Sequence, residues 1–359
     1  MKAKIILDAM NSIANIPRDK SALDAYTSIM FDIRENVMVM WATNEFITVG
    51  QKIDHDLSYS GHVILGFKYF YTVMKMSGKD SSIDFNANGA IITPEGYSQK
   101  TYHISSIDPT SFVDVSGIKI KNGKKIPGDT FLNVSRAKQF CNEKDKVRSF
   151  LQNPWLVGHE GSILVGTDGF SIYEYKISDE MLADGKIPIP SVFEIYSEND
   201  IEMCEYGNYY IFKADNWIAR QLKMASVLPD YYKVMEGMDG RSITMDKREA
   251  LDAMKVPSFY ASQGEEIHNF IELKIEDSIM KISGVNPANS DTSVDSVAIK
   301  NNGVGNCQLY VKPRLLKSSI DICTSDTVEI QISEDNRMMF HTGIPSERVL
   351  VMPMKSLED

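Results

Sequence analysis

The chain has 359 residues, of which 43% are hydrophobic and 24% are charged, and its net charge is −11 at neutral pH. This balance is typical of two or three globular domains and excludes a largely disordered chain. The sequence contains no run of about eighteen apolar residues, the length that a membrane-spanning helix needs. Asp8 interrupts the N-terminal apolar stretch too early for a signal peptide. The sequence therefore predicts a cytoplasmic protein with no membrane association.

The first third of the chain alternates helical and strand patterns. Apolar residues at near-helical spacing predict a helix over residues 4–14, and a second helix is predicted over residues 66–76, ended by Ser77 and Gly78. Strands are predicted over 26–33, 37–42 and 46–49 and within 83–104. This third closes at residues 107–112.

A similar order of elements then occurs twice more. In the middle third, Ser135 is expected to cap a helix that runs to Glu143, and a short helix is expected near Pro190. The last third is expected to hold helices over 246–254 and 313–323. The strands expected in these two thirds are 155–157, 162–166, 171–177, 201–213, 270–282, 293–299, 327–332, 337–341 and 348–352.

The three thirds of the chain, each with two helices among short strands, indicate internal repetition. Charged, glycine-rich stretches at 121–125 and 237–240 mark linkers, so the predicted domains are residues 1–122, 123–238 and 239–359. The fold class expected is α+β with antiparallel sheets. On periodicity alone, an irregular α+β protein in two domains fits about as well.

Charge is distributed unevenly among the six expected helices. Net charges are +3 for each of 66–79, 136–148 and 312–319, +1 for 4–20, −2 for 190–199 and zero for 246–255. The helices together are positive, so the rest of the chain is more acidic than the whole. Basic helices in an acidic protein suit a cationic lining that attracts a phosphate backbone without reading bases. Lys and Arg also collect on ordinary solvated helix faces, so charge alone leaves both interpretations open.

The sequence contains no recognisable metal or catalytic motif, so neither a metal nor a cofactor is expected. The cysteines are dispersed and form no CxxC pair: Cys141, Cys204, Cys307 and Cys323. Asp168 and Asp230 could be imagined as paired carboxylates of a β-rich hydrolase, but both lie in turn-like contexts that favour Asp for backbone reasons. A β-rich structural or adhesion protein of virion type is a further alternative.

Four short stretches carry a distinctive pattern in a fixed order. They read VGTDGFSI at 165–172, LPDYYKV at 228–234, VLVMPMK at 349–355 and VRSFL at 147–151. They resemble the segments A-T-D-G-H-R-L, F-P-D-Y-R-R-V, V-V-M-P-M-R and V-R-Y-Y-L of the bacterial replicative sliding clamp, the β subunit of the DNA polymerase holoenzyme. The resemblance extends over essentially the whole chain, with residues 107–109 at the expected end of the first domain.

The resemblance implies three domains of one topology per chain, each with two helices that face a central hole and antiparallel sheets outside. Two chains would join head to tail into a homodimeric ring around duplex DNA, through edge strands of the first and third domains. The protein would be a replication processivity factor that is not an enzyme. Its partners would be the replicative DNA polymerase and a clamp loader.

In the family, partner proteins insert a short peptide into an apolar cleft between the second and third domains. Carried over by match, the cleft and its rim would comprise Leu151, Thr167, Gly169, Phe170, Ile172, Pro229, Lys233, Val234, Val351, Met352, Pro353 and Met354. A groove rich in Met adapts to leucine and aromatic anchors from many partners. Without the resemblance, these residues would be interpreted as ordinary core.

The chain departs from the family at several of these positions. Phe170 and Ser171 replace the family's His-Arg pair, which removes a cation from the cleft rim, and Lys233 stands where the family commonly has Arg. The chain also continues through residues 356–359, beyond the usual end. These departures favour a divergent, phage-encoded clamp with an altered partner preference.

Lys20 aligns with a family Arg that touches DNA in the hole. The other expected DNA-facing residues follow from charge and helix position only: Lys68, Lys75, Arg136, Lys138, Lys312, Arg314 and Lys317.

Overall fold

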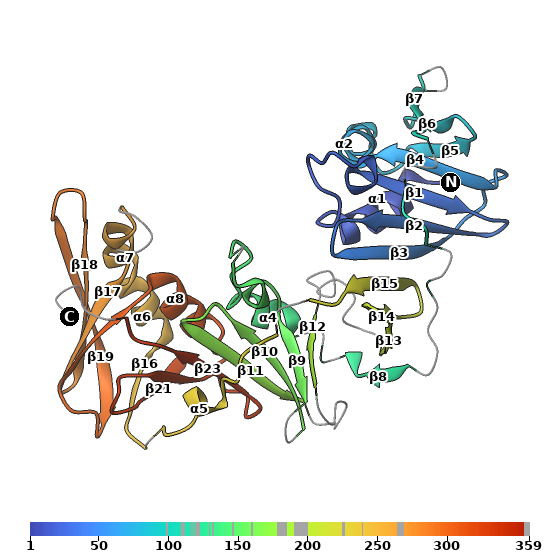
Figure 1. Cartoon of the computed structure of the whole chain (residues 1–359). Coiled ribbons are helices and arrows are strands. Elements are labelled where there is room, and N and C mark those ends of the chain that lie inside the picture. Colours follow the sequence, from blue (N-terminus) through green and yellow to red (C-terminus); the bar gives the residue numbers. More distant parts are fainter. Residues whose placement is uncertain are drawn as a thin grey trace. The chain divides into compact units, whose positions relative to one another are not determined.

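The structure is a computed structural model of the chain (Figure 1). It describes all residues except 98–99, 109–111, 116–117, 119–122, 129, 131–132, 146, 159–160, 178–184, 190–199, 225–226, 239, 264–268 and 355–359. The helix expected near Pro190 and parts of both expected linkers lie outside the described residues. The chain forms two compact units: unit 1 holds residues 1–132 and 192–223, and unit 2 holds residues 133–191 and 224–359.

Unit 1 contains an eight-stranded antiparallel sheet of order β4-β1-β2-β3-β15-β14-β13-β8 and a three-stranded sheet β5-β6-β7. Its strands are β1 (Ser28–Ile33), β2 (Val37–Thr43), β3 (Ile47–Asp54), β4 (Gly61–Gly66), β5 (Ser82–Asn86), β6 (Gly89–Thr93), β7 (Tyr102–Ser105), β8 (Lys124–Ile126), β13 (Ile201–Tyr206), β14 (Tyr209–Lys213) and β15 (Trp217–Leu222). Its helical segments are α1 (Ala3–Ile13), η1 (Asp24–Thr27) and α2 (Phe67–Ser77).

The two helices of unit 1 form where apolar residues recur at helical spacing. In α1, Ile6, Met10 and Ile13 are fully buried, and in α2 the buried residues include Phe70 and Met74. The helices contact each other, and α2 also packs on β1 and β4. Each helix therefore packs with its apolar face and leaves its lysines, among other residues, on the exposed face.

Unit 2 contains a twelve-stranded antiparallel sheet of order β12-β9-β10-β11-β23-β22-β21-β16-β19-β18-β17-β20. Its strands are β9 (Trp155–Gly158), β10 (Ser162–Thr167), β11 (Ser171–Ile177), β12 (Gly185–Pro188), β16 (Ser242–Asp246), β17 (Ile271–Glu276), β18 (Ile279–Val285), β19 (Thr292–Asn302), β20 (Cys307–Val311), β21 (Thr327–Ile332), β22 (Met338–His341) and β23 (Glu347–Val351). Its helical segments are α4 (Val134–Lys138), η3 (Ser149–Leu151), α5 (Tyr232–Met235), α6 (Lys247–Ala253), α7 (Lys255–Ala261) and α8 (Pro313–Asp321).

One order of elements occurs three times along the chain. The last repeat runs β16, α6–α7, β17–β20, α8 and β21–β23, and the first runs α1, β1–β4, α2 and β5–β7. The middle repeat runs β8, α4 and β9–β12 in the same order and ends with β13–β15. Strand order matches as well, because β4-β1-β2-β3, β12-β9-β10-β11 and β20-β17-β18-β19 are equivalent. The predicted α+β class and threefold repetition are confirmed, whereas the boundaries at 122 and 238 stay a prediction.

Two glycines let helices approach the sheet of unit 2 closely. A Cβ at Gly166 on β10 would overlap the carbonyl oxygen of Ala137 in α4, and a Cβ at Gly284 on β18 would overlap that of Pro257 in α7. A glycine that allows a helix to approach the sheet closely therefore occurs in both the second and the third repeat.

Two helix predictions need correction. Ser135 lies inside α4, whose N-cap is Asn133, and α4 ends at Lys138 instead of continuing to Glu143. The chain leaves the helix because the Asn142 amide donates to the carbonyl of Leu151 rather than extending the helical pattern. The helix expected over 246–254 is α6, which α7 follows directly.

None of the helices in the described part of the chain is long and apolar enough to cross a membrane.

Candidate functional site

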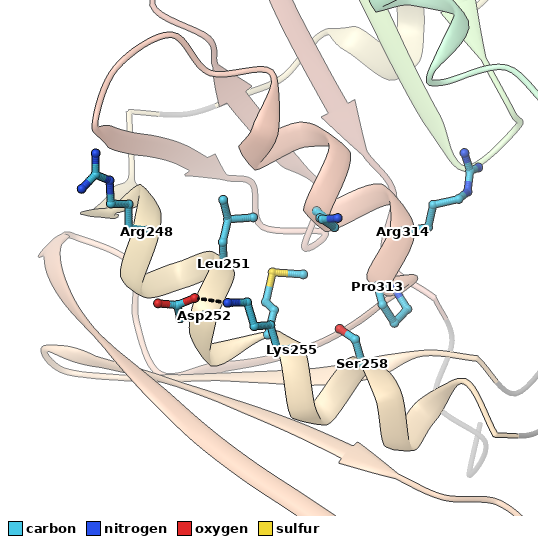
Figure 2. A pocket seen from close by; sticks show the side chains of 9 residues that line it. Arg248, Leu251, Asp252, Lys255, Ser258, Pro313 and Arg314 are labelled. Atoms are coloured by element: carbon cyan, nitrogen blue, oxygen red, sulfur yellow. Dashed lines mark hydrogen bonds and ion pairs between the residues drawn. The ribbon is translucent and has the colours of Figure 1, made fainter.

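A groove lies between α6–α7 and α8 in unit 2, with a volume of about 770 Å³ (Figure 2). We call it the basic groove. It is lined by Arg248, Leu251, Asp252, Met254, Lys255, Ser258, Pro313, Arg314 and Lys317. Four cations against one carboxylate give the lining a positive charge, with apolar side chains between them.

The local sequence explains how the two walls form. The Asp246 side chain caps α6 by accepting hydrogen bonds from the amides of Arg248 and Glu249. Pro313 stands at the first turn of α8, where its missing N–H costs nothing. Because α8 turns Leu315 and its other apolar residues inward, its basic residues remain on the outer face.

Both lysines of the groove pair with a single carboxylate and remain accessible. Lys255 lies 2.5 Å from Asp252, Lys317 lies 4.0 Å from Asp321, and the side chains of both lysines are about 70% exposed, at 72% and 67%. Exposed pairs of this kind are weak and exchange readily with other anions. The arrangement therefore suits a phosphate backbone bound without base readout.

Arg248 and Lys255 were not predicted from the sequence, because the charges of residues 246–255 sum to zero. The structure separates those charges. Asp246 is engaged with backbone amides, and Glu249 does not line the groove. Charges placed on a helical wheel, rather than summed along the segment, would have indicated these two cations.

The predicted cations of unit 1 lie on or near its two helices. Lys20 is exposed after α1. On α2, Lys68 pairs with Asp19 at 3.1 Å, and the Lys75 ammonium lies 4.1 Å from the centre of the Tyr71 ring. Exposed cations therefore gather on the helical side of this unit also.

The Arg136 side chain makes partly buried hydrogen bonds within unit 2 and does not lie free on a helix face. Its guanidinium binds both carboxylate oxygens of Glu347 at 2.5 and 2.6 Å and donates to the carbonyl of Ile322. Burial, which would lower the pKa of Arg136, is outweighed by the hydrogen bond and charge of Glu347, which raise that pKa. The Tyr173 hydroxyl also donates to Glu347, at 2.6 Å. Arg136 therefore joins α4 to β23, and we leave it out of the DNA-facing set proposed below.

Three other predicted cations of unit 2, Lys138, Lys312 and Arg314, contact either a carboxylate or an aromatic ring. Lys138 pairs with Glu143 at 3.1 Å. The Lys312 ammonium lies 4.0 Å from the centre of the Phe170 ring, a cation–π contact at the expected cleft rim. Arg314 pairs with Asp168 at 2.7 Å while also lining the basic groove.

The structure brings several expected cleft residues together in one apolar cluster. Ile172 and Leu350 face the same side of the β11–β23 pair, and Val234 and Met352 pack against them. Leu151 is buried beside the turn at Gly169, where a Cβ would stand 3.7 Å from its Cδ1 atom. The remaining members of this cluster are Trp155, Val157, Val165, Leu228, Tyr231, Met235 and Met339.

The Thr167–Gly169 turn is fixed by its own side chains. The Thr167 hydroxyl donates to the carbonyl of Ser171 at 2.6 Å, and Gly169 has φ +87°, a conformation that favours glycine. Asp168 accepts hydrogen bonds from the Phe170 amide and from the amide and hydroxyl of Ser171. Asp168 is thus held by its turn and by Arg314, and its role here is to fix the backbone.

The C-terminal strand continues along this turn. The Met352 amide donates to the Phe170 carbonyl at 2.8 Å, and the Met354 amide donates to the Tyr310 carbonyl at 2.7 Å. Val351 is fully buried, and Pro353 is half-buried. The expected cleft residues of the C-terminal segment therefore flank the β10–β11 turn.

Two expected cleft residues remain at the surface. Pro229 and Lys233 are exposed, and the carbonyl of Pro229 accepts a hydrogen bond from Lys186 at 3.3 Å. Asp230 is also exposed and accepts from the Tyr232 amide, so its carboxylate, like that of Asp168, serves a turn. Among the described residues, no group of three His, Cys, Asp or Glu side chains could hold a metal ion.

No protein-family model matches the sequence, and no curated protein matches it significantly. Solved structures do match over nearly the whole chain. A DnaN sliding clamp (DNA polymerase III subunit beta) from Bartonella birtlesii superposes with a TM-score of 0.85 at 13% identity, covering 99% of both chains. The DNA polymerase III beta subunit from Thermotoga maritima gives 0.84 at 14% identity, covering 99% of this chain and 98% of that one.

A third structure, a DnaN sliding clamp from Pseudomonas aeruginosa bound to griselimycin, gives a TM-score of 0.83 at 14% identity, covering 99% of this chain and 98% of that one. The sequence identity to these proteins is low, yet the chain superposes on them over nearly its whole length. The chain therefore has the fold of the bacterial DNA polymerase sliding clamps.

Proposed function

We propose that this protein is a DNA sliding clamp, a cytoplasmic replication processivity factor without catalytic activity. Two copies would join head to tail into a ring that encircles duplex DNA. The ring would tether the replicative DNA polymerase and other partners through the apolar cleft, and a clamp loader would place it on DNA.

The observation that carries the proposal is the way consecutive repeats join. The third strand of the first repeat, β3, pairs with the last strand of the second, β15. The third strand of the second repeat, β11, pairs with the last strand of the third, β23. By the same rule, β19 of the third repeat would pair with β7 of a first repeat, and in the proposed ring a second chain supplies that strand.

Both of these strands have an edge that no other described strand of the chain pairs with. In the described part of the chain, β7 pairs with β6 alone, and residues 292–298 of β19 pair with β18 alone. Exposed strand edges invite pairing, so proteins either protect them or use them for assembly. A contact between two different edges is heterologous, and it closes into a ring when the rotation closes.

Exposed apolar side chains lie beside the two edges. On unit 1, Met76 and Tyr97 are 83% and 61% exposed and line one shallow pocket with Tyr102 of β7. On unit 2, Phe259 is 62% exposed on α7, which packs against β19, and Val294 of β19 is 64% exposed. Apolar residues of this kind next to an open edge are expected at a protein interface.

The basic groove supports the DNA part of the proposal. The family's fold turns its helices toward the hole, and the groove is formed by the helices of the third repeat. In unit 1, Lys20, Lys68 and Lys75 lie on or near the equivalent helices. A positive inner lining in a protein with a net charge of −11 would attract DNA to the hole and discourage binding elsewhere.

The mass of the particle in solution tests the assembly. We expect a dimer of twice 40.4 kDa by light scattering after gel filtration. Phe259→Asp should place a charge in the interface and release monomers of 40.4 kDa. The matched control is Tyr206→Asp on β13, where the residue is 64% exposed on a strand that pairs with β14 and β8, and this variant should remain dimeric. A wild-type monomer, or equal behaviour of the two variants, would contradict the proposed interface.

The salt dependence of binding to duplex DNA tests the groove. The double variant Arg248→Gln, Lys255→Gln should weaken binding equally for all sequences and reduce the slope of log K against log salt by about 0.9 for each lost phosphate contact. Lys213→Gln, an exposed cation on β14, is the control and should leave the slope unchanged. An unchanged slope in the double variant would remove the groove from the proposed DNA-facing surface.

A further inference from the structure

The third strands of the three repeats can be aligned by the residue pair that closes each hairpin. Thr48 on β3 and Ile172 on β11 each pair with the last residue of the preceding strand. In the third repeat, Thr292 on β19 makes the equivalent pair with the last residue of β18. The two glycines that lie under helices agree with this alignment, since Gly166 and Gly284 each stand one position before the end of their strand.

The last strands of the first two repeats can be aligned in the same way. Ser105 on β7 pairs with Gly89, the first residue of β6. Leu222 on β15 pairs with Tyr209, the first residue of β14. In both cases the next amide along the chain donates to the carbonyl just before that partner, at 2.8 Å. The strand β7 can therefore be placed on β15 residue by residue.

The two junctions within the chain have the same register. At β3–β15, Thr48 lies opposite Arg220. At β11–β23, Ile172 lies opposite Leu350. In both junctions the amide two positions further along the last strand donates across the junction at 2.8 Å. The register is therefore kept although the side chains of the two junctions differ.

We propose that β7 of one chain pairs antiparallel with β19 of a second chain in this same register, so that Lys100 lies directly opposite Asp295. His103 is the equivalent of Arg220, and it then lies opposite Thr292. Three residues back along β7 and three forward along β19, the register brings the lysine and the aspartate together. The inference rests on the proposed function, because it takes the junction between two chains and assigns its register and one ion pair.

The position of Lys100 is buried at both junctions within the chain. Its equivalents there are Trp217 and Glu347, each 3% exposed. The backbone hydrogen bond lies one residue further on, for example from the Lys52 amide to the Asn216 carbonyl at 2.6 Å in β3–β15. The position therefore belongs to a non-hydrogen-bonded pair, whose side chains lie closer together. Such a place brings the two charged groups into contact and shields them from salt.

Both charged groups are accessible in the single chain. Lys100 and Asp295 are exposed. The Lys100 ammonium lies 5.4 and 5.6 Å from the ring centres of Tyr97 and Tyr102, the two groups that raise its pKa. The Asp295 carboxylate accepts a hydrogen bond from the Ser296 amide at 2.7 Å. These contacts are with uncharged groups, so a pair between chains replaces none of the ion pairs seen in the described part of the chain.

The neighbouring helix of the third repeat also suits a lysine at this position. At β11–β23, Arg136 of α4 binds Glu347. Its equivalent on α7 is Val256, because the residue after each of them lies over the glycine of its sheet. Val256 is 51% exposed. An apolar side chain therefore replaces the arginine, and the methylene stem of Lys100 can pack against it without repulsion from a cation.

An exchange of charge across the junction tests the register by analytical ultracentrifugation of the full chain. Lys100→Asp alone, or Asp295→Lys alone, should raise the dimer dissociation constant by about tenfold or more, because like charges then face each other. The double variant Lys100→Asp, Asp295→Lys should return it to within about threefold of the wild-type value. The matched control is Lys100→Asp with Ser293→Lys, which should stay weak because Ser293 faces Lys100 only in a register shifted by two residues.

A disulfide between chains tests the same register without charge. Lys100→Cys combined with Asp295→Cys should give covalent dimers on mild oxidation, since directly opposed residues of this kind lie about 4.5 Å apart and fit a disulfide. Lys100→Cys combined with Ser293→Cys should not, because diagonal neighbours lie about 7–8 Å apart. The wild type, which carries the four native cysteines, is the control for other cross-links.

The outcomes separate this inference from the proposed function. If the wild type is dimeric but the exchange restores nothing and the Lys100→Cys, Asp295→Cys pair forms no cross-link, the two-chain junction stands and the register is wrong. Rescue by Ser293→Lys would establish a shifted register and overturn the inference as well. If the wild type is monomeric in gel filtration, the proposed ring fails. Cross-linking of the same cysteine pair in concentrated protein then decides the register, which covalent dimers support and their absence rejects.

Discussion

The two places where consecutive repeats join are built from different side chains. At β3–β15 in unit 1, backbone pairing is accompanied by buried neutral residues, among them Thr48 and Gln221. At β11–β23 in unit 2, backbone pairing is accompanied by three charge pairs, Arg136–Glu347, Arg314–Asp168 and Arg348–Glu174. Since both junctions form, charge pairs are not required to join two repeats.

The additional charges at β11–β23 lie where the proposed cleft is found. The Arg136 pair fixes α4 against β23, and the Arg314 pair fixes α8 against the β10–β11 turn. In each pair the carboxylate is nearly inaccessible while the arginine is partly exposed. This difference indicates that the junction charges position the surfaces around the cleft, in addition to holding the repeats together.

Removal of the most deeply buried of these carboxylates should have the largest effect. The Glu347 side chain is fully buried and binds Arg136 and Tyr173, so Glu347→Ala leaves a partly buried guanidinium without its counter-ion and the Tyr173 hydroxyl without its acceptor. We expect the free energy of unfolding to fall by about 3–5 kcal/mol, measured by chemical denaturation of the full chain. Glu329→Ala on β21, an exposed position, is the control and should change it by less than about 0.5 kcal/mol. A loss below about 1 kcal/mol at Glu347 would remove the distinction between the junctions.

The close approach of α4 to β10 gives a smaller, steric effect beside the same junction. Gly166→Ala would place a Cβ against the backbone of Ala137, which cannot rotate away, and should destabilise the chain by about 1–3 kcal/mol. At Gly66 an added Cβ meets nothing within 4 Å, so Gly66→Ala serves as the matched substitution. Similar melting temperatures for the two variants would show that α4 is not held tightly on the sheet.

The neutral junction should respond weakly to loss of a polar group. The Thr48 hydroxyl lies 2.9 Å from that of Thr43, and Thr48→Val removes this hydrogen bond while keeping the side-chain shape. We expect the free energy of unfolding to fall by about 1 kcal/mol in the same denaturation assay. A loss as large as that of Glu347→Ala would mean that the two junctions depend equally on their polar side chains.

The smallest effect is expected where the charged groups lie at the surface. Hydrogen bonds from Lys281 and Lys274 lower the pKa of Glu276 on β17 to about 2. A lowered pKa in the folded state stabilises the protein above the ordinary pKa near 4.5, and this contribution is lost as the pH falls from there toward 2. Because the site is exposed, the effect on stability should be slight, and NMR titration is the suitable measurement. Lys281→Gln should raise the pKa of Glu276, and an unchanged titration would show that the pair does not persist in solution.

Elements with a strong local pattern could be predicted from the sequence. The spacing of Ile6, Met10 and Ile13 indicates α1, and Pro313 followed by an amphipathic stretch indicates α8. The strands β8 and β12 were missed, because residues 124–126 and 185–188 are short and owe their extended form to pairing with β13 and β9. The helix α7 was missed because Pro257 suggests a break, although it stands in the first turn, where proline is tolerated.

Side-chain partners could not be predicted in the same way. Arg136 contributes to a basic segment in the sequence, yet it binds Glu347, which lies 211 positions away. Arg248 and Lys255 are masked in the sequence by neighbouring acids, two of which, Asp246 and Glu249, do not line the groove.

The central claim is that two chains form a ring around DNA, and the most direct measurement is electron microscopy of the purified protein. The account predicts ring-shaped particles of two chains with a central opening wide enough for a double helix. Solid particles without an opening, seen at concentrations where the protein is dimeric, would contradict it.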